Sequence, residues 1–149
     1  FGGGSELEKL QQRVKDEHID NVIFKGFVEK KYIPYILSKS SVNVLNYSQS
    51  NYNWSRGNSS NKLFEYMASG KPIISTVKMG YCILDKYQCG LSLEECTPQA
   101  LAEQILKIHD MPAETYAQMA HNAQEGAKDF DFSVLTERLY HVIESVEQK

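Results

Sequence analysis

The fold of this chain is decided by the stretch Asn58-Ser-Ser-Asn-Lys-Leu-Phe-Glu-Tyr-Met-Ala-Ser-Gly-Lys-Pro-Ile-Ile-Ser75. It reads as a polar loop, a short helix, a helix stop and a buried strand. Ser60 is a candidate N-cap, because its side-chain oxygen can accept a backbone N–H of the first turn. Gly70 stands where a helix end favours a left-handed residue, and Pro72 cannot continue the helix.

This helix has a polar side and an apolar side at 100° per residue. The polar arc holds Asn61, Lys62, Glu65 and Ser69, and the apolar arc holds Leu63, Phe64, Met67 and Ala68. Free backbone amides and a lysine in the first turn attract a phosphate. A carboxylate one turn further along can accept hydrogen bonds from two hydroxyls. The helix therefore suits a nucleoside diphosphate with its ribose.

The same stretch carries a family resemblance. The run Glu65-Tyr-Met-Ala-Ser-Gly-Lys-Pro-Ile-Ile74 resembles the donor-binding helix of retaining GT-B glycosyltransferases of family 4, the group 1 transferases, and Ser60–Glu65 resembles a bacterial subgroup that builds surface polysaccharides. Gly2–Glu6 stands where the family has Gly-x-Gly-x-Glu, and Asn21–Val28 stands for its Asn-Val-x-Phe-x-Gly-x-Val strand and turn. The resemblance covers nearly the whole chain.

The resemblance implies an α/β fold, with a Rossmann-like parallel sheet that has helices on both faces, as in the C-terminal half of a GT-B fold. Residues 1–149 are expected to be a nucleotide-sugar donor-binding domain, a fragment without the N-terminal acceptor domain and without the first strand and loop of this domain. The implied enzyme is a retaining hexosyltransferase, with the isolated fragment inactive. Its partners would be a nucleoside-diphosphate sugar, the N-terminal domain, and an acceptor glycan or lipid-linked sugar.

No cofactor, metal or nucleic acid is expected. The implied location is the cytoplasm, and the full-length enzyme could associate peripherally with the inner face of the membrane. The donor-binding residues implied are Gly4, Phe27, Val28, Arg56, Ser59, Ser60, Asn61, Lys62 and Glu65. The resemblance leaves the catalytic residues unassigned, because those of the acceptor side are expected in the N-terminal domain. The family carries two glutamates eight positions apart. Glu65 matches the second, but Gly57 stands at the position of the first.

Hydrophobic periodicity and turn residues predict strands that alternate with helices, which is typical of a parallel sheet. The predicted helices cover residues 5–17, 29–39 (starting near Pro34), 60–69, 80–87 (ended by Gly90), 97–109 (capped by Thr97), 112–128 and a last helix capped by Ser133. The predicted strands cover residues 21–24, 42–45, 72–76 and 91–93. The loops 24–29, 46–60 and 76–81 follow strand ends, so they should converge on one ligand crevice.

Composition is ordinary for a soluble globular domain, with 42% hydrophobic and 23% charged residues. No apolar run is long enough to span a bilayer, and no signal peptide is visible. Residues 21–80 hold eight basic and two acidic residues, a net charge of +6, which favours an anionic ligand there. The alternative is a set of solvated lysines. The cysteines, Cys82, Cys89 and Cys96, have no metal-ligand spacing and are expected to be free thiols in a reducing cytosol.

Several alternatives remain open. The run Gly2–Gly4 is either a strand-to-helix turn near the ligand or a linker scar, and Leu7 breaks the dinucleotide Gly-x-Gly-x-x-Gly pattern. The loop Tyr47–Trp54 has aromatic and amide side chains for a sugar, unless Trp54 fills the core beneath the loop. The histidines are expected on the surface. Two alternatives to a glycosyltransferase remain. One is a nucleotide-sugar epimerase or phosphorylase of the same fold, and the other is a non-catalytic nucleotide-binding module.

Overall fold

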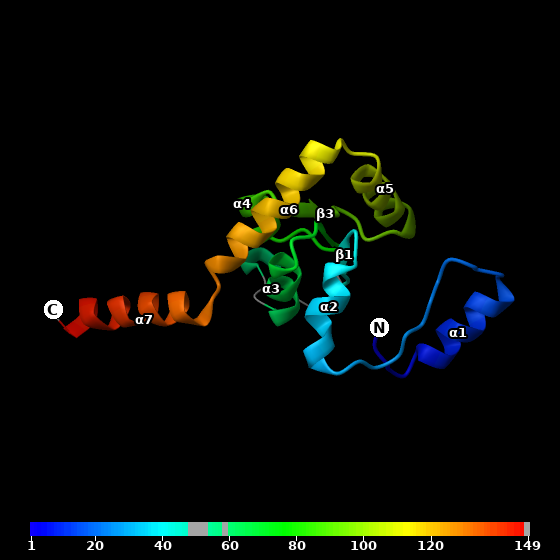
Figure 1. The fold of residues 1–149 in the computed structure, drawn as a ribbon, viewed down its shortest axis with the longest axis horizontal. Coiled ribbons are helices and arrows are strands. Elements are labelled where there is room, and N and C mark those ends of the chain that lie inside the picture. Colours follow the sequence, from blue (N-terminus) through cyan, green and yellow to red (C-terminus); the bar gives the residue numbers. More distant parts are fainter. Residues whose placement is uncertain (48–53, 58–59, 148–149) are drawn as a thin grey trace. The chain divides into compact units, whose positions relative to one another are not determined.

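The computed structural model describes residues 1–47, 54–57 and 60–147 (Figure 1). The chain divides into two compact units, unit 1 (Phe1–Ile36) and unit 2 (Leu37–Lys149), and each is described by itself. Within the described ranges, no helix has the length and apolar character needed to cross a membrane.

Unit 2 is built on a parallel sheet of three strands in the order β1-β2-β3. The strands are β1 (Asn43–Leu45), β2 (Ile73–Ser75) and β3 (Gly90–Ser92). Val44 lies opposite Ile74, which lies opposite Leu91. The crossover from β1 to β2 contains η2 (Trp54–Arg56) and α3 (Asn61–Ala68), and the crossover from β2 to β3 contains α4 (Ile83–Tyr87).

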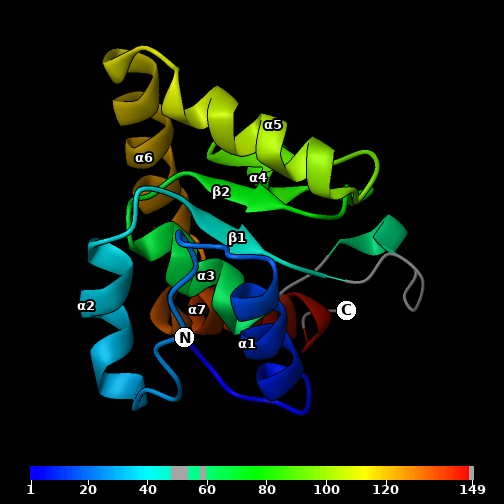
Figure 2. The same ribbon diagram turned by 90° about the vertical axis from the view of Figure 1, so that its right-hand side faces the viewer.

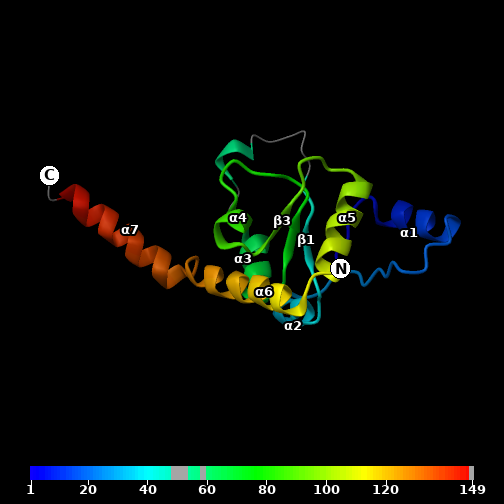
Figure 3. The same ribbon diagram turned by 90° about the horizontal axis from the view of Figure 1, so that it is seen from above.

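Helices cover both faces of this sheet. Both crossovers step in the same direction across the sheet, so right-handed connections place α3 and α4 on one face. Figures 2 and 3 show α5 (Pro98–His109) on the opposite face from α3. Next come α6 (Ala113–Lys128), which packs against α3 and α4, and α7 (Phe132–Glu147). The predicted parallel sheet with helices on both faces is confirmed.

The core of unit 2 lies between the sheet and the layer of α3, α4 and α6. Its buried members are Leu45, Leu63, Met67, Ile73, Ile83, Leu84, Cys89 and Ala123. Phe64 stacks on Phe130 at a ring-centroid distance of 4.4 Å. On the apolar arc of α3, Leu63 and Met67 are therefore buried and Phe64 is half-buried, whereas Ala68 is exposed.

Unit 1 contains α1 (Leu7–Asp16), the 3₁₀ turn η1 (Lys30–Tyr32) and the start of α2 (Ile33–Ser38), with Pro34 in the first turn of α2 as the sequence requires. The strand predicted at residues 21–24 is wrong. In the described ranges this segment joins no strand ladder, and Ile23 is 71% exposed. A β-strand exists only through hydrogen bonds to a neighbouring strand, which an apolar run cannot supply by itself.

Two predicted helix signals are also wrong. Helix α4 ends at Tyr87 as predicted, but it begins at Ile83 rather than at residue 80, and its stop is Gln88 in the left-handed conformation (φ 51°). Gly90 instead begins β3, where a Cβ would lie 2.1 Å from the Ile73 carbonyl oxygen. Ser133 does not cap α7. Its N–H and Oγ–H both donate to the Asp131 carboxylate, which takes the capping role. The predicted cap of α5 is confirmed, because Thr97 Oγ1 accepts the Ala100 N–H at 3.1 Å.

Candidate donor-binding site

Two loops meet at the carboxyl edge of the sheet in unit 2. The Gly80 N–H donates to the Trp54 carbonyl oxygen at 3.0 Å, and the Tyr47 N–H donates to Thr76 Oγ1 at 2.8 Å. A Cβ on Gly57 would lie 2.5 Å from the Tyr81 carbonyl oxygen. The described parts of loops 46–60 and 76–81 therefore converge as predicted. Loop 24–29 belongs to unit 1, and its convergence stays a prediction.

Helix α3 begins at this edge, and Ser60 occupies its N-cap position in an extended conformation (φ −68°, ψ 141°). The prediction that its side chain caps the helix is wrong, because Ser60 makes no side-chain cap hydrogen bond. Ser60 Oγ is instead hydrogen-bonded to the Tyr47 hydroxyl at 2.6 Å. The Ser60 hydroxyl is thus bonded to Tyr47, 13 residues earlier, and not to a backbone N–H of its own helix.

The polar arc of α3 is open to solvent at its start. Asn61 and Lys62 are exposed, whereas Glu65, one turn along, is half-buried. Lys62 and Glu65 form no ion pair with each other or with other residues in the described ranges. The helix ends at Ala68, and Gly70 two residues later has φ of 64°, which confirms the predicted left-handed stop. A lysine and a carboxylate thus stand in the order that a diphosphate followed by a ribose requires.

The neighbouring loop contributes Arg56, which is exposed at the end of η2. Trp54 is half-buried, and its ring lies 5.2 Å from that of Tyr47. Residues 48–53 of the predicted sugar-binding loop lie outside the described residues, so its role and the alternative that Trp54 fills the core both stay predictions. Ser59, another predicted site residue, lies outside the described residues.

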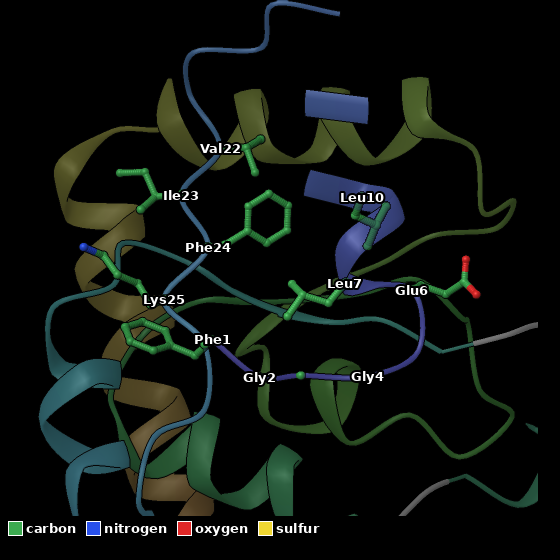
Figure 4. A pocket seen from close by; sticks show the side chains of 12 residues that line it. Phe1, Gly2, Gly4, Glu6, Leu7, Leu10, Val22, Ile23, Phe24 and Lys25 are labelled. Atoms are coloured by element: carbon green, nitrogen blue, oxygen red, sulfur yellow. The ribbon is translucent and has the colours of Figure 1, made fainter. Parts of the chain in front are cut away.

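The glycine run of unit 1 forms an ordered turn into α1. Gly2 and Gly4 have φ of 125° and 157°, and the Leu7 N–H donates to the Gly4 carbonyl oxygen at 3.2 Å. Figure 4 shows this turn beside a pocket lined by Phe1, Leu7, Leu10, Val22, Ile23 and Phe24. The run thus turns into a helix as predicted, but no described strand precedes it, and its place near a ligand stays a prediction.

The other predicted site residues of unit 1 lie away from that pocket lining. Phe27 is 85% exposed and Val28 is half-buried, and neither lines the pocket. Their assignment to a donor site stays a prediction, as does that of Gly4.

Several charged and reactive residues outside α3 can be set aside as candidate ligand contacts. Within the basic block, Lys78 pairs with Glu94 and Lys31 with Glu29, so these lysines are structural or solvated. Three free thiols are present, as expected, and burial raises the pKa of Cys89 to about 12, which keeps that thiol protonated and unreactive. All four histidines are exposed, as predicted.

Sequence reasoning placed Tyr47 in a loop suited to a sugar, but it missed the hydrogen bonds that join Tyr47 to Thr76 at this edge. Thr76 is 1% exposed and its hydroxyl is bonded to the Tyr47 backbone. A usable signal was present, because Thr76 directly follows β2, Tyr47 comes two residues after β1, and polar residues at the carboxyl ends of parallel strands gather around ligands.

The parallel sheet with helices on both faces makes this an α/β domain with a Rossmann-like fold, a class in which ligands bind at the carboxyl edge of the sheet. Residues 1–126 match the sequence profile of the family described as "Glycosyl transferases group 1", and the chain belongs to that family. A search of curated protein sequences found no significant match.

Solved structures share this fold. Sucrose-phosphate synthase from Thermosynechococcus elongatus superposes with a TM-score of 0.69 at 22% identity, over 96% of this chain and 35% of that protein. HepE from Anabaena in complex with UDP-glucose superposes with a TM-score of 0.69 at 21% identity, over 97% of this chain and 39% of that protein. HepE with UDP and glucose gives a TM-score of 0.66 at 22% identity, over 93% of this chain and 36% of that protein.

The chain thus spans little more than a third of the length of these proteins. The expected fold, the Rossmann-like C-terminal half of a GT-B glycosyltransferase, is confirmed. The resemblance found in the sequence to the group 1 transferases is confirmed as family membership.

Proposed function

We propose that this chain is the donor-binding half of a retaining hexosyltransferase that moves a sugar from a nucleoside diphosphate to a polysaccharide or lipid-linked acceptor. Membership of the group 1 family supports this proposal. The Anabaena relative, which shares the fold, is described in complex with UDP-glucose. The observation that carries the proposal is the start of α3, where Lys62 is exposed and without an ion-pair partner in the described ranges.

The chemistry asked of this site is electrostatic. The N–H groups of Asn61 and Lys62 meet no hydrogen-bond acceptor among the described residues, so no described group covers the positive end of the helix dipole. A diphosphate leaving group gains negative charge as the glycosidic bond breaks. The first-turn N–H groups and Lys62 are already in place before the reaction. They can therefore stabilise that charge without a costly rearrangement of the protein.

Replacing Lys62 by alanine is expected to weaken UDP binding by about tenfold, the scale of one lost charge-assisted hydrogen bond. UDP is the first probe because the Anabaena structures contain it. Calorimetric titration of the full-length protein measures the change, and higher salt should weaken wild-type binding as well. Lys71→Ala is the control, since it removes the same charge beyond the other end of α3. Equal affinity of wild type and Lys62→Ala would show that the phosphate lies elsewhere.

We propose further that residues 1–149 alone bind UDP weakly and transfer no sugar. The acceptor and the remaining catalytic groups belong to the other half of a two-domain enzyme, and catalysis in a cleft requires both halves to enclose the reacting centre. The test incubates the purified residues with a panel of nucleotide sugars and sugar acceptors. Detectable transfer would contradict the proposal. With a lipid-linked acceptor, the full enzyme would work in the cytoplasm at the inner membrane face.

A further inference from the structure

Tyr47 is held from two sides at the carboxyl edge of the sheet. Its N–H donates to Thr76 Oγ1 at 2.8 Å, and Thr76 Oγ1 donates to its carbonyl oxygen at 3.0 Å. Because Thr76 is buried at the end of β2, the Tyr47 backbone cannot shift without breaking both bonds. The ring lies 5.2 Å from the ring of Trp54, which sets the direction of the side chain.

The hydroxyl of this fixed tyrosine reaches Ser60, with 2.6 Å between the two oxygens. A serine at an N-cap ordinarily accepts an N–H from the second or third helical residue, here Lys62 or Leu63. In this structure that bond is absent, and the Leu63 N–H donates to the Ser60 carbonyl oxygen instead. Of the first-turn donors in the described range, those of Asn61 and Lys62 are left open.

We propose that Tyr47 is a positioning residue, which holds the Ser60 hydroxyl away from the helix and so keeps the first-turn N–H groups of α3 available to the diphosphate. This inference rests on the proposed function, which places the diphosphate at that helix start. A serine that caps its own helix occupies the donor a phosphate oxygen needs, so the ligand would have to displace the cap. Tyr47 removes that competition before the ligand arrives.

A merely structural role makes different predictions. If Tyr47 only joined the loop to α3, loss of its hydroxyl would loosen the site, and a further loss of the Ser60 hydroxyl could not restore it. If Tyr47 prevents capping, the second change restores binding, because alanine at position 60 has no oxygen with which to cap. Tyr47→Phe keeps the ring and its contact with Trp54, so this variant changes the hydroxyl alone.

The experiment compares the full-length protein with Tyr47→Phe, Ser60→Ala and the double variant, by hydrogen exchange without ligand and by titration with UDP. In Tyr47→Phe we expect the Lys62 or Leu63 amide to exchange about fivefold more slowly and UDP to bind about fivefold more weakly. In the double variant both quantities should return to within about twofold of Ser60→Ala.

The readouts separate two kinds of failure. Unchanged exchange in Tyr47→Phe would overturn the inference whether or not UDP binds, and so would a double variant that binds UDP no better than Tyr47→Phe. Slower exchange in Tyr47→Phe together with no UDP binding by the wild type would instead show that Tyr47 prevents capping while the proposed donor site is wrong.

Discussion

Gly57→Glu is expected to lower the free energy of unfolding by about 3 kcal/mol and to add no activity. This change restores the glutamate that the family resemblance places eight positions before Glu65. Gly57 has φ of 82°, where side chains are strained, and its Cβ would lie 2.5 Å from the Tyr81 carbonyl oxygen. The backbone of the neighbouring loop therefore occupies the space that any side chain would need. Chemical denaturation measures the loss, and donor turnover by the full-length enzyme measures the activity.

Two alanine variants separate the causes. Gly57→Ala should lose nearly as much stability as Gly57→Glu, because the clash begins at Cβ. Gly26→Ala is the matched control, since Gly26 has φ of 67° but no atom within 4 Å of a built Cβ. It should lose only about 1 kcal/mol from the strained φ. Equal losses at both positions would mean that the Tyr81 backbone moves aside at little cost, and that the missing glutamate has no steric explanation.

Glu65→Gln in the full-length enzyme is expected to raise KM for the nucleotide sugar by about tenfold or more, the scale of weakening two charge-assisted hydrogen bonds. Glu65 lies four residues after Asn61, about 6 Å along the helix axis, which is close to the distance from a diphosphate to the ribose hydroxyls of one nucleotide. The alternative, an ion pair of Glu65 with Lys62, is not formed in the described structure. Its carboxylate is therefore available to a ligand.

The sugar of the nucleotide gives the decisive comparison. A 2′-deoxyribose donor should bind the wild type more weakly than the ribose donor, whereas Glu65→Gln should hardly distinguish the two, because the contact is already lost. Glu103→Gln on α5 is the control, since it neutralises an exposed helical glutamate on the other face of the sheet. If Glu65→Gln kept wild-type kinetics and still preferred ribose, Glu65 would be an ordinary surface residue and the site would need a different ribose contact.

Several elements could be predicted because their signals are local. The α3 stop at Gly70 and the Thr97 cap of α5 each depend on residues within one helical turn. Ile73 and Ile74 belong to an apolar run between turn residues, and such a run is buried on both faces of a parallel sheet. The alternation of strands and helices was enough to predict a parallel sheet. The parallel sheet in turn predicts the edge at which a ligand binds.

Two of the errors share one cause. Residues 21–24 have the composition of a strand but no ladder, because pairing requires a second segment in register. Gly90 follows a helix and was predicted to end it. Its lack of a side chain instead allows the Ile73 backbone of the neighbouring strand to approach closely. In both cases the deciding partner is absent from the local window.

The candidate site also has features that follow from local sequence and features that depend on contacts between distant segments. Local sequence was enough to place Asn61, Lys62 and Glu65 on the polar arc of one helix at the carboxyl edge of a parallel sheet, because helical periodicity and strand order are local or nearly local properties. Only the tertiary structure decided that Ser60 does not cap this helix and that Gly57 admits no side chain. Both outcomes depend on backbone and hydroxyl groups brought from Tyr47 and Tyr81, and contacts across loops are set by the packing of the whole unit.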